Sequence, residues 1–404
     1  MYRVVVAISS QQIPSLSFPN RKGSINMNFC SSYEAEDSWR DLTNDGKLVI
    51  PKKLYYRNQN GKALPFKGTN VNVGGFDQPT PLFLRGDHIT ISSGYKYFRA
   101  QNAARETTTT NQIFSGFISE VGSGMPIEMK LEDNMWLLKQ TAIDTKTFSD
   151  SDGLNAILKF LVDKVNEQWA ARIGFNITFN ALTQTNFGTF VVGNESAAQV
   201  LQRLQKTYGF ESFFRGNELR CGVTPYIESE AVTKTFTFQQ DIIEDNIKYQ
   251  RKDDIILSAI ARNTITENTG ATTKDGTPKT RKKRLEVLVS LFNGKITKKV
   301  INPGDRIAEN NEGERRTFFF PAAKTTDDLA NAAIDEIQKY YYDGLKGDFL
   351  GFALPYMRAG DNVNLVDLKM PERNGVYRLK KVEYSGSVSG GLRQRMYLDF
   401  KVNV

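Results

Sequence analysis

The residues that could perform chemistry in this chain are few, and the most suggestive are the neighbouring carboxylates Glu132 and Asp133. They end the strand-like segment IFSGFISEVGSGMPIEMKLED, after which the spacing of apolar residues changes from a period of two. A pair of carboxylates is what a glycoside hydrolase needs. Adjacent residues at the end of a strand point to opposite faces, however, so they form a poor facing pair and a good start for a helix. We therefore interpret Glu132–Asp133 as a structural joint between two parts of the fold.

Other catalytic or metal-binding arrangements lack the residues that they need. His88 is the only histidine and lies in the strand-like DHITIS, so a nucleophile activated by histidine has no other base. Cys30 and Cys221 are far apart and show neither metal nor disulfide spacing. The glycine run at 73–75 lacks the strand-to-helix setting of a phosphate-binding loop. We predict no catalytic, cofactor-binding or metal-binding residues.

The formal net charge is +8, and much of the basic excess lies in residues 273–300, TKDGTPKTRKKRLEVLVSLFNGKITKKV. A basic patch can indicate a nucleic-acid partner. Most charge runs are solvated surface, however, and no aromatic residues interleave the RKKR run as base stacking would require. We expect a solvated hairpin with a basic tip, and nucleic-acid binding through 273–300 is the alternative.

Hydrophobic periodicity divides the chain into three regions. Residues 1–125 alternate with a period of two, as β-strands do. Apolar residues at helical spacing then appear in 150–171 and 195–210, among short strands. From about 232 the period of two returns, and 404 residues exceed the usual size of one domain. The sequence therefore predicts an α+β fold, mostly β, in which a small α/β insert separates two β domains.

The predicted boundaries are 1–131 for the first β domain, 132–230 for the α/β insert and 231–404 for the second β domain. The second β domain also carries a basic hairpin, over 255–300, and a helix, over 326–343, which Thr326 can cap. No run of 18 apolar residues exists, so we expect no membrane anchor.

The order of these parts resembles the bacteriophage tail baseplate hub family, which includes the late control D proteins and the hub half of the type VI secretion spike protein. DSWRDLTNDGKLVIPKK (37–53) resembles the N-terminal segment of such hubs. IFSGFISEVGSGMPIEMKLEDNMWLLKQ (113–140) resembles their hairpin and the start of their insert, and SAAQVLQRLQKTYGFESFFRGNEL (196–219) resembles the insert's second helix and hairpin. The segment 347–400 resembles the end of the second barrel, and its matching residues are Gly360, Asp361, Val363, Gly375, Tyr377 and Val382. The long basic hairpin near 265–300 departs from the family pattern.

This resemblance implies two hub-type β-barrel domains and a structural virion protein, not an enzyme. Hubs of this family form a ring-shaped homotrimer in which the two β domains of each subunit are similar, so that three subunits match a sixfold tail tube. The first β region (about 1–125) and the second (about 232–404) are the candidate repeats.

The implied partners are a second copy of the chain, a tail tube or distal tail protein, and a spike or tail-tip protein. The implied location is the baseplate or tip of a virion tail, after synthesis in the host bacterial cytoplasm, with a channel for genome ejection. A contractile injection system is included in this expectation. The resemblance implies no cofactor and no sequence-specific nucleic acid.

One alternative belongs to a different class, a tail-associated protein that binds or hydrolyses cell-wall glycan. Exposed tyrosines on a β-rich chain could bind sugars. Hydrolysis would require a pocket with two facing carboxylates about 5–10 Å apart.

Overall fold

The computed structural model describes most of the chain between residues 30 and 402. The described ranges are 30–51, 83–98, 107–124, 126–149, 151–183, 189–224, 226–272, 278–302, 304–305, 314–320 and 323–402. Elsewhere only short strands are described, namely β1 (Arg3–Val5), β2 (Ser15–Ser17), β3 (Ser24–Asn26), β6 (Tyr55–Arg57), β7 (Ala63–Pro65), β8 (Asn70–Val71) and β9 (Thr80–Pro81). The glycine run at 73–75 and residues 273–277 of the basic stretch lie outside the described residues.

The first large element is an antiparallel sheet with the strand order β10-β11-β12-β5-β4. Its strands are β4 (Ser32–Ser38), β5 (Asp45–Ile50), β10 (His88–Phe98), β11 (Thr107–Val121) and β12 (Ile127–Glu132). The period of two in the sequence is the reason for this pairing, because Ile127, Met129 and Leu131 all point into one core while the residues between them stay exposed.

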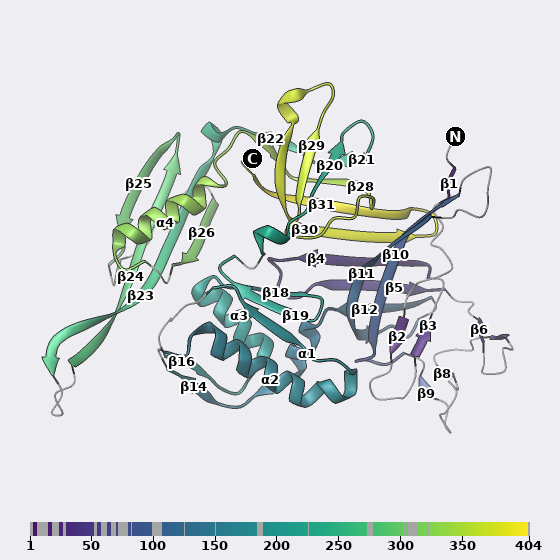
Figure 1. The fold of residues 1–404 in the computed structure, drawn as a ribbon, viewed down its shortest axis with the longest axis horizontal. Helices are drawn as coiled ribbons and strands as arrows, with labels where there is room; N and C mark the ends of the chain where they lie inside the picture. Colours follow the sequence, from purple (N-terminus) through teal and green to yellow (C-terminus); the bar gives the residue numbers. More distant parts are fainter. Residues whose placement is uncertain are drawn as a thin grey trace.

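The second large element is an antiparallel sheet with the strand order β29-β30-β31-β28-β21. Its strands are β21 (Ile242–Asp245), β28 (Asp348–Phe352), β29 (Asn362–Val366), β30 (Gly375–Ser387) and β31 (Gly391–Lys401). β20 (Thr233–Thr237) adds to β29 in parallel. β4 pairs with β30, so the two sheets are continuous and share one hydrophobic core (Figure 1). The predicted fold class, α+β and mostly β, is confirmed.

The two sheets are copies of one topology. β4, β5, β10, β11 and β12 of the first repeat correspond to β21, β28, β29, β30 and β31 of the second, in the same chain order and the same spatial order. In both repeats a register shift separates two equivalent cross-strand pairs. These pairs are Ile118–Leu131 and Val121–Met129 in the first repeat, and Leu379–Leu398 and Val382–Met396 in the second.

The turn that precedes β10 recurs before β29. Gly86 and Gly360 have φ angles of 87° and 89°, a left-handed conformation that glycine adopts without strain. The Gly86 N–H donates to the Ile118 carbonyl at 2.8 Å, and the Gly360 N–H donates to the Leu379 carbonyl at the same distance. The match in both conformation and hydrogen bonding shows that the repeat extends to its loops.

The aspartate after each of these glycines closes the turn. The Asp87 carboxylate accepts the Leu84 N–H at 2.9 Å, and the Asp361 carboxylate accepts the Arg358 N–H at 2.8 Å. Both aspartates are buried, so their hydrogen bonds to the backbone hold the turn away from water.

The α/β insert lies below the first sheet in Figure 1 and has its own hydrophobic core. Its elements are α1 (Met135–Gln140), β13 (Ala142–Ile143), β14 (Lys146–Phe148), α2 (Gly153–Ile173), β15 (Thr178–Ala181), β16 (Phe190–Val192), β17 (Glu195–Ser196), α3 (Ala197–Tyr208), β18 (Glu211–Arg215) and β19 (Glu218–Gly222). α3 begins with a capping box between Ser196 and Gln199 and ends at Gly209, as its sequence pattern favours.

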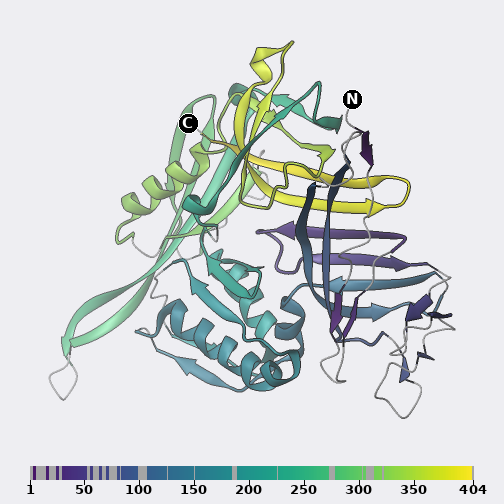
Figure 2. The same cartoon turned by 45° about the vertical axis from the view of Figure 1, so that its right-hand side comes forward.

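A separate four-stranded sheet forms what we call the hairpin unit, residues 256–338, which projects to one side in Figures 1 and 2. Its elements are β23 (Ile256–Thr272), β24 (Pro278–Phe292), β25 (Lys295–Val300), β26 (Glu314–Phe319) and α4 (Thr326–Gln338), with the strand order β25-β24-β23-β26. α4 packs on β23 and β24 through its apolar stripe. It ends at Gln338, before the predicted residue 343, because the chain turns at 339–341. Thr325 caps it, so the prediction of Thr326 was wrong by one residue.

The hairpin unit is inserted between β21 and β28, where the first repeat has only the loop 39–44. Two short strands, β22 (Lys248–Gln250) and β27 (Gly344–Lys346), pair at its base. The remaining short elements are η1 (Glu228–Glu230), η2 (Lys252–Asp254) and η3 (Pro371–Arg373). Within the described residues, no helix has the length and apolar character that crossing a membrane requires.

Candidate functional site

Glu132 and Asp133 lie where β12 passes into α1, and they do not face each other as an acid and a base. The exposed side of this joint is an ion pair, in which Lys139 Nζ lies 2.7 Å from Glu132 Oε2. The buried side is a helix start, in which the Asp133 carboxylate accepts the Met135 N–H at 3.0 Å. The Asp133 N–H donates to the Asn44 carbonyl at 3.0 Å, which ties the joint to the loop between β4 and β5. The geometry is that of a structural joint.

Asp133 is nevertheless unusual, because its carboxyl is buried with one oxygen, Oδ2, that has no hydrogen-bond partner among the described residues. Burial raises the pKa of Asp133 to about 7, although the Met135 N–H works in the opposite direction. The carboxyl therefore keeps its proton to a higher pH than an exposed aspartate does. Shifts of this kind cluster at functional sites but also occur in structural networks.

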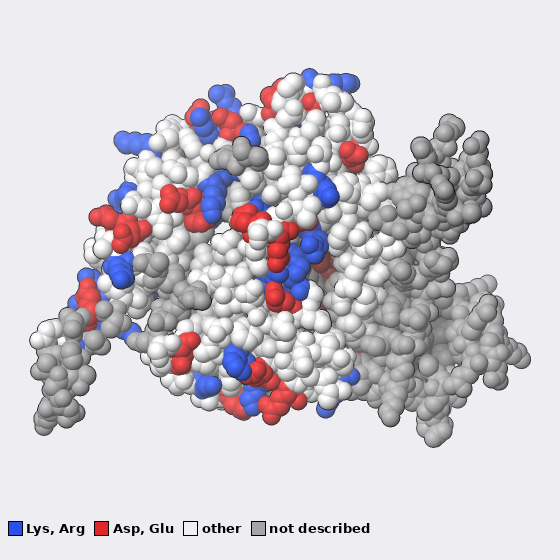
Figure 3. All heavy atoms as spheres, viewed as in Figure 1, with Lys and Arg blue, Asp and Glu red and all other residues white. Residues whose placement is uncertain are grey.

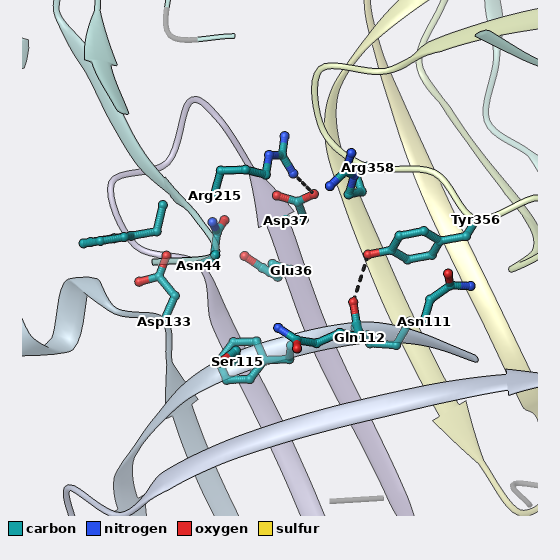
Figure 4. A pocket seen from close by; sticks show the side chains of 14 residues that line it. Glu36, Asp37, Asn44, Asn111, Gln112, Ser115, Asp133, Arg215, Tyr356 and Arg358 are labelled. Atoms are coloured by element: carbon teal, nitrogen blue, oxygen red, sulfur yellow. Dashed lines mark hydrogen bonds and ion pairs between the residues drawn. The ribbon is translucent and has the colours of Figure 1, made fainter. Parts of the chain in front are cut away.

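Asp133 lines a pocket of about 500 Å³ at the meeting point of the two sheets and the insert (Figure 4). Its charged lining residues come from three parts of the chain and are Glu36, Asp37, Asp133, Arg215 and Arg358. Two of the other polar lining residues, Gln112 and Tyr356, are joined across the pocket by a 3.1 Å hydrogen bond from the Tyr356 hydroxyl to the Gln112 carbonyl. The pocket is thus a polar junction.

Two of the pocket's carboxylates, those of Asp37 and Glu36, form ion pairs. Asp37 Oδ2 accepts from Arg215 Nη1 at 3.1 Å and from the Ala359 N–H at 3.0 Å, which links the first sheet to the insert and to the second sheet. Glu36 forms an ion pair with Lys381 at 3.0 Å, and burial raises the pKa of Glu36. These bonds hold the three parts of the fold together.

Sequence reasoning singled out only Asp133 among these residues. Glu36 and Asp37 lie in β4, Arg215 ends β18, and Arg358 precedes β29. More than a hundred residues of chain separate β4 from Arg215 and Arg215 from Arg358, so no local spacing could have revealed that they meet. The sequence contained only a weak indication of this site, the adjacent acidic residues Glu36 and Asp37 in a strand that also carries buried residues.

A second pocket, of about 410 Å³, lies where the hairpin unit meets the insert and the second sheet. Arg40 Nη2 lies 3.2 Å from Asp399 Oδ2 and 2.9 Å from the Tyr340 hydroxyl, and the Arg316 guanidinium stacks over the Tyr340 ring. These contacts join the loop after β4 to β31 and to the chain after α4. This pocket is also a packing joint between units.

His88 and the cysteines have no geometry for catalysis. The His88 ring packs against Phe117 at 5.1 Å, its Nε2 lies 3.2 Å from Ser115 Oγ, and burial lowers its pKa to about 4. Cys30 and Cys221 are free and buried, and burial raises the pKa of their thiols to about 11 and about 12. No cluster of histidine, cysteine, aspartate or glutamate side chains in the described part of the chain could hold a metal ion.

The basic strands of the hairpin unit carry their own counter-charges. Lys283 Nζ lies 2.7 Å from Glu267 Oε1, and Arg284 and Arg262 both contact Glu286. On the face drawn in Figure 3, lysines and arginines are interspersed with acidic residues and form no continuous stripe. A surface of mixed charge is typical of solvated structure, not of a nucleic-acid groove.

Comparison with known proteins identifies solved structures of similar fold but no protein of similar sequence. No protein-family model matches the chain, and no curated protein matches it significantly. The tail protein from Neisseria meningitidis MC58 superposes with a TM-score of 0.50 at 11% identity, over 96% of this chain and 97% of that one.

Two further solved structures align over most of the chain. The prophage MuSo2 43 kDa tail protein from Shewanella oneidensis has a TM-score of 0.48 at 10% identity, over 96% of this chain and 97% of that one. A component of the type VI secretion system from E. coli has a TM-score of 0.43 at 9% identity, over 96% and 77%. With scores below 0.5, these two do not by themselves establish a shared fold. The chain shares its fold with the tail protein from Neisseria meningitidis MC58.

Proposed function

We propose that this chain is a structural tail protein that acts as a baseplate or tail-tip hub. The observation that carries the proposal is the internal repeat, two five-stranded sheets with the same strand order, register shift and glycine–aspartate turn. The fold shared with the Neisseria tail protein over almost the whole of both chains supports it.

A doubled sheet has a specific use in a tail. A ring of three copies would present six similar sheets, which match a sixfold tail tube, while the insert and the hairpin unit would occur only three times. Such a ring joins the tube or a distal tail protein to a threefold spike or tip, and its centre is a channel for the genome. The hub acts in the virion tail, without catalysis, and Asp37 and Glu36 in the pocket described above serve to hold the parts of the chain together.

The test is the absolute mass of the purified protein by light scattering, followed by negative-stain images. We expect a species of three times 45.6 kDa with a central hole. A single chain at every attainable concentration, with no ring in the images, would contradict the proposal.

One observation favours a second candidate function, glycan binding or hydrolysis. The 500 Å³ pocket contains Asp133, whose raised pKa suits a general acid, beside Glu36 and Asp37. Release of sugars from purified peptidoglycan, abolished by Asp133→Asn, would support this candidate. No release from peptidoglycan by the wild-type protein would leave the hub as the function.

A further inference from the structure

The joint between the two repeats is a strand pairing. β4 has two neighbours, β5 on one edge and the second half of β30 on the other. In the β30 ladder, Ser38 lies opposite Lys381 and Asp37 opposite Val382. The Trp39 indole adds a hydrogen bond of 3.2 Å to the Leu379 carbonyl. With both edges paired, only one of the seven residues of β4 is exposed.

The equivalent of β4 in the second repeat can be located by register. β12 and β31 pair with β5 and β28 in the same way, so Leu48 corresponds to Phe349. These residues pair in turn with Tyr33 in β4 and with Asp245 in β21. β4 thus corresponds to residues 244–250, which comprise the end of β21 and all of β22.

This equivalent strand has a neighbour on one edge only. β21 pairs with β28 and β22 with β27, and no strand of the described residues pairs with their outer edge. Ile243 is 42% exposed and Tyr249 is 51% exposed, whereas the side chain of Asp37, the residue of β4 that corresponds to Tyr249, is 15% exposed. An unpaired edge with exposed apolar side chains is a ready template for another strand.

The first repeat has a matching uncovered edge at the end of β11. Val382 is fully buried because β4 covers it, whereas its equivalent, Val121, is only partly buried. β10 pairs with β11 only as far as Phe117, so the edge of β11 at Glu120 and Val121 has no strand beside it among the described residues. Among the described residues, therefore, no strand pairs with the outer edge of β21 and β22 in the second repeat, and no strand covers the β11–β12 hairpin of the first.

We propose that β22 of one copy pairs antiparallel with the end of β11 in a second copy, which repeats between chains the joint that β4 and β30 make within one chain. The register of that joint places Gln250 opposite Glu120 and Tyr249 opposite Val121. The β11–β12 turn at 122–126 limits the new ladder to about three residue pairs, and Ile243 lies beside this turn. The inference rests on the proposed ring, and it names the surface that forms it.

The occupant of the edge is a second copy because the chain supplies both halves of the contact. Each copy presents one free edge and one uncovered hairpin, which is a head-to-tail arrangement that closes into a ring. Along such a ring, the β4–β30 joint within a chain alternates with the β22–β11 joint between chains. Every sheet is then paired with another sheet on both sides. An unrelated strand would fill the edge but would leave Val121 uncovered.

The experiment is disulfide trapping with the double variant Glu120→Cys/Gln250→Cys. Residues opposite each other in an antiparallel ladder have Cα atoms about 4.5–5.5 Å apart, within the range of a disulfide. Cys30 and Cys221 are buried and do not compete. Glu120 contributes only an exposed ion pair with Lys130, so its replacement leaves the fold intact.

The matched control is Glu120→Cys/Lys295→Cys, which moves the second thiol to β25, another free sheet edge. Thiols held opposite each other react at a much higher effective concentration than colliding ones, so we expect roughly tenfold or more covalent dimer and trimer than from the control. Each single variant gives none, and a mixture of the two single variants gives dimer only.

The outcome separates this pairing from the proposed function. A trimer by light scattering without covalent product from Glu120→Cys/Gln250→Cys overturns the pairing and leaves the ring. A monomer without covalent product overturns both. Equal product from the test and control pairs also overturns the pairing.

Discussion

Replacing Asp133 by asparagine is expected to change stability in a way that depends on pH. The folded pKa of about 7 lies above the ordinary value of 3.8, so the folded protein holds a proton that the unfolded chain releases between these two values. Wild-type stability is therefore unaffected by this group below pH 3.8, falls as pH rises, and is lowest above pH 7. The amide of the variant does not ionise and escapes this loss.

The magnitude follows from the size of the shift. A rise of the pKa from 3.8 to about 7 is worth roughly 4 kcal/mol in full, of which more than half develops between pH 5 and pH 8. Asparagine keeps the acceptor for the Met135 N–H but buries an unpaired amide, which costs about 1–3 kcal/mol at every pH. The variant should thus be close to wild type, or less stable, at pH 5 and more stable at pH 8.

Urea unfolding at pH 5 and pH 8, monitored by tryptophan fluorescence, measures the difference. Asp133→Ala is the control, because it shares the loss of the titrating group and also loses the hydrogen bond to Met135. It should show the same change between the two pH values, offset by about 1 kcal/mol. A free-energy difference between wild type and Asp133→Asn that is equal at pH 5 and pH 8 would refute the reasoning.

Three further predictions concern the repeat, the insert and the hairpin unit. Gly86→Ala and Gly360→Ala should each lower the unfolding free energy, measured in urea, by at least about 1–2 kcal/mol, because both residues have positive φ. Gly86→Ala should cost more, since its new Cβ would lie 3.0 Å from the Trp136 ring. A variant as stable as wild type would contradict this. Ser196→Ala should lower the unfolding free energy by about 1 kcal/mol through loss of the capping box, and no loss would show that packing alone sets the start of α3. Replacing 266–280 by a short glycine turn should leave both the light-scattering mass and the retention of duplex DNA at physiological salt unchanged, and lost retention would favour the nucleic-acid alternative.

Much of the fold could be read from the sequence because its periodicities are local. The alternation at Ile127, Met129 and Leu131 and the helical stripe of α3 each depend on residues within one element. The capping of α4 was misplaced by one residue because Thr325 and Thr326 are both good caps, and only the reciprocal bonds with Asp328 distinguish them.

The polar junction around Asp133 could not be read in this way. Asp37, Arg215 and Ala359 are joined by hydrogen bonds that span the first sheet, the insert and the second sheet, and each residue is ordinary in its own segment. The repeat was expected only from the family resemblance, because many equivalent positions hold different residue types and only scattered ones, such as Gly86 and Gly360, hold the same type. His88 corresponds to Asn362 and Phe117 to Arg378, and only the register reveals the match.

The differences between the repeats are as informative as their likeness. Between β4 and β5 the first repeat has the loop 39–44, whereas the second repeat has the whole hairpin unit at the corresponding place between β21 and β28. The α/β insert follows β12, whereas the chain after β31 continues with no described element. In the proposed ring, strands alone would recur six times, and both insertions would recur three times. In that ring a sixfold tube would contact the sheets, and the insert and the hairpin unit would be available to a threefold spike. We therefore expect deletion of residues 266–280 to spare the contact with the tube, whatever it does to the contact with the spike.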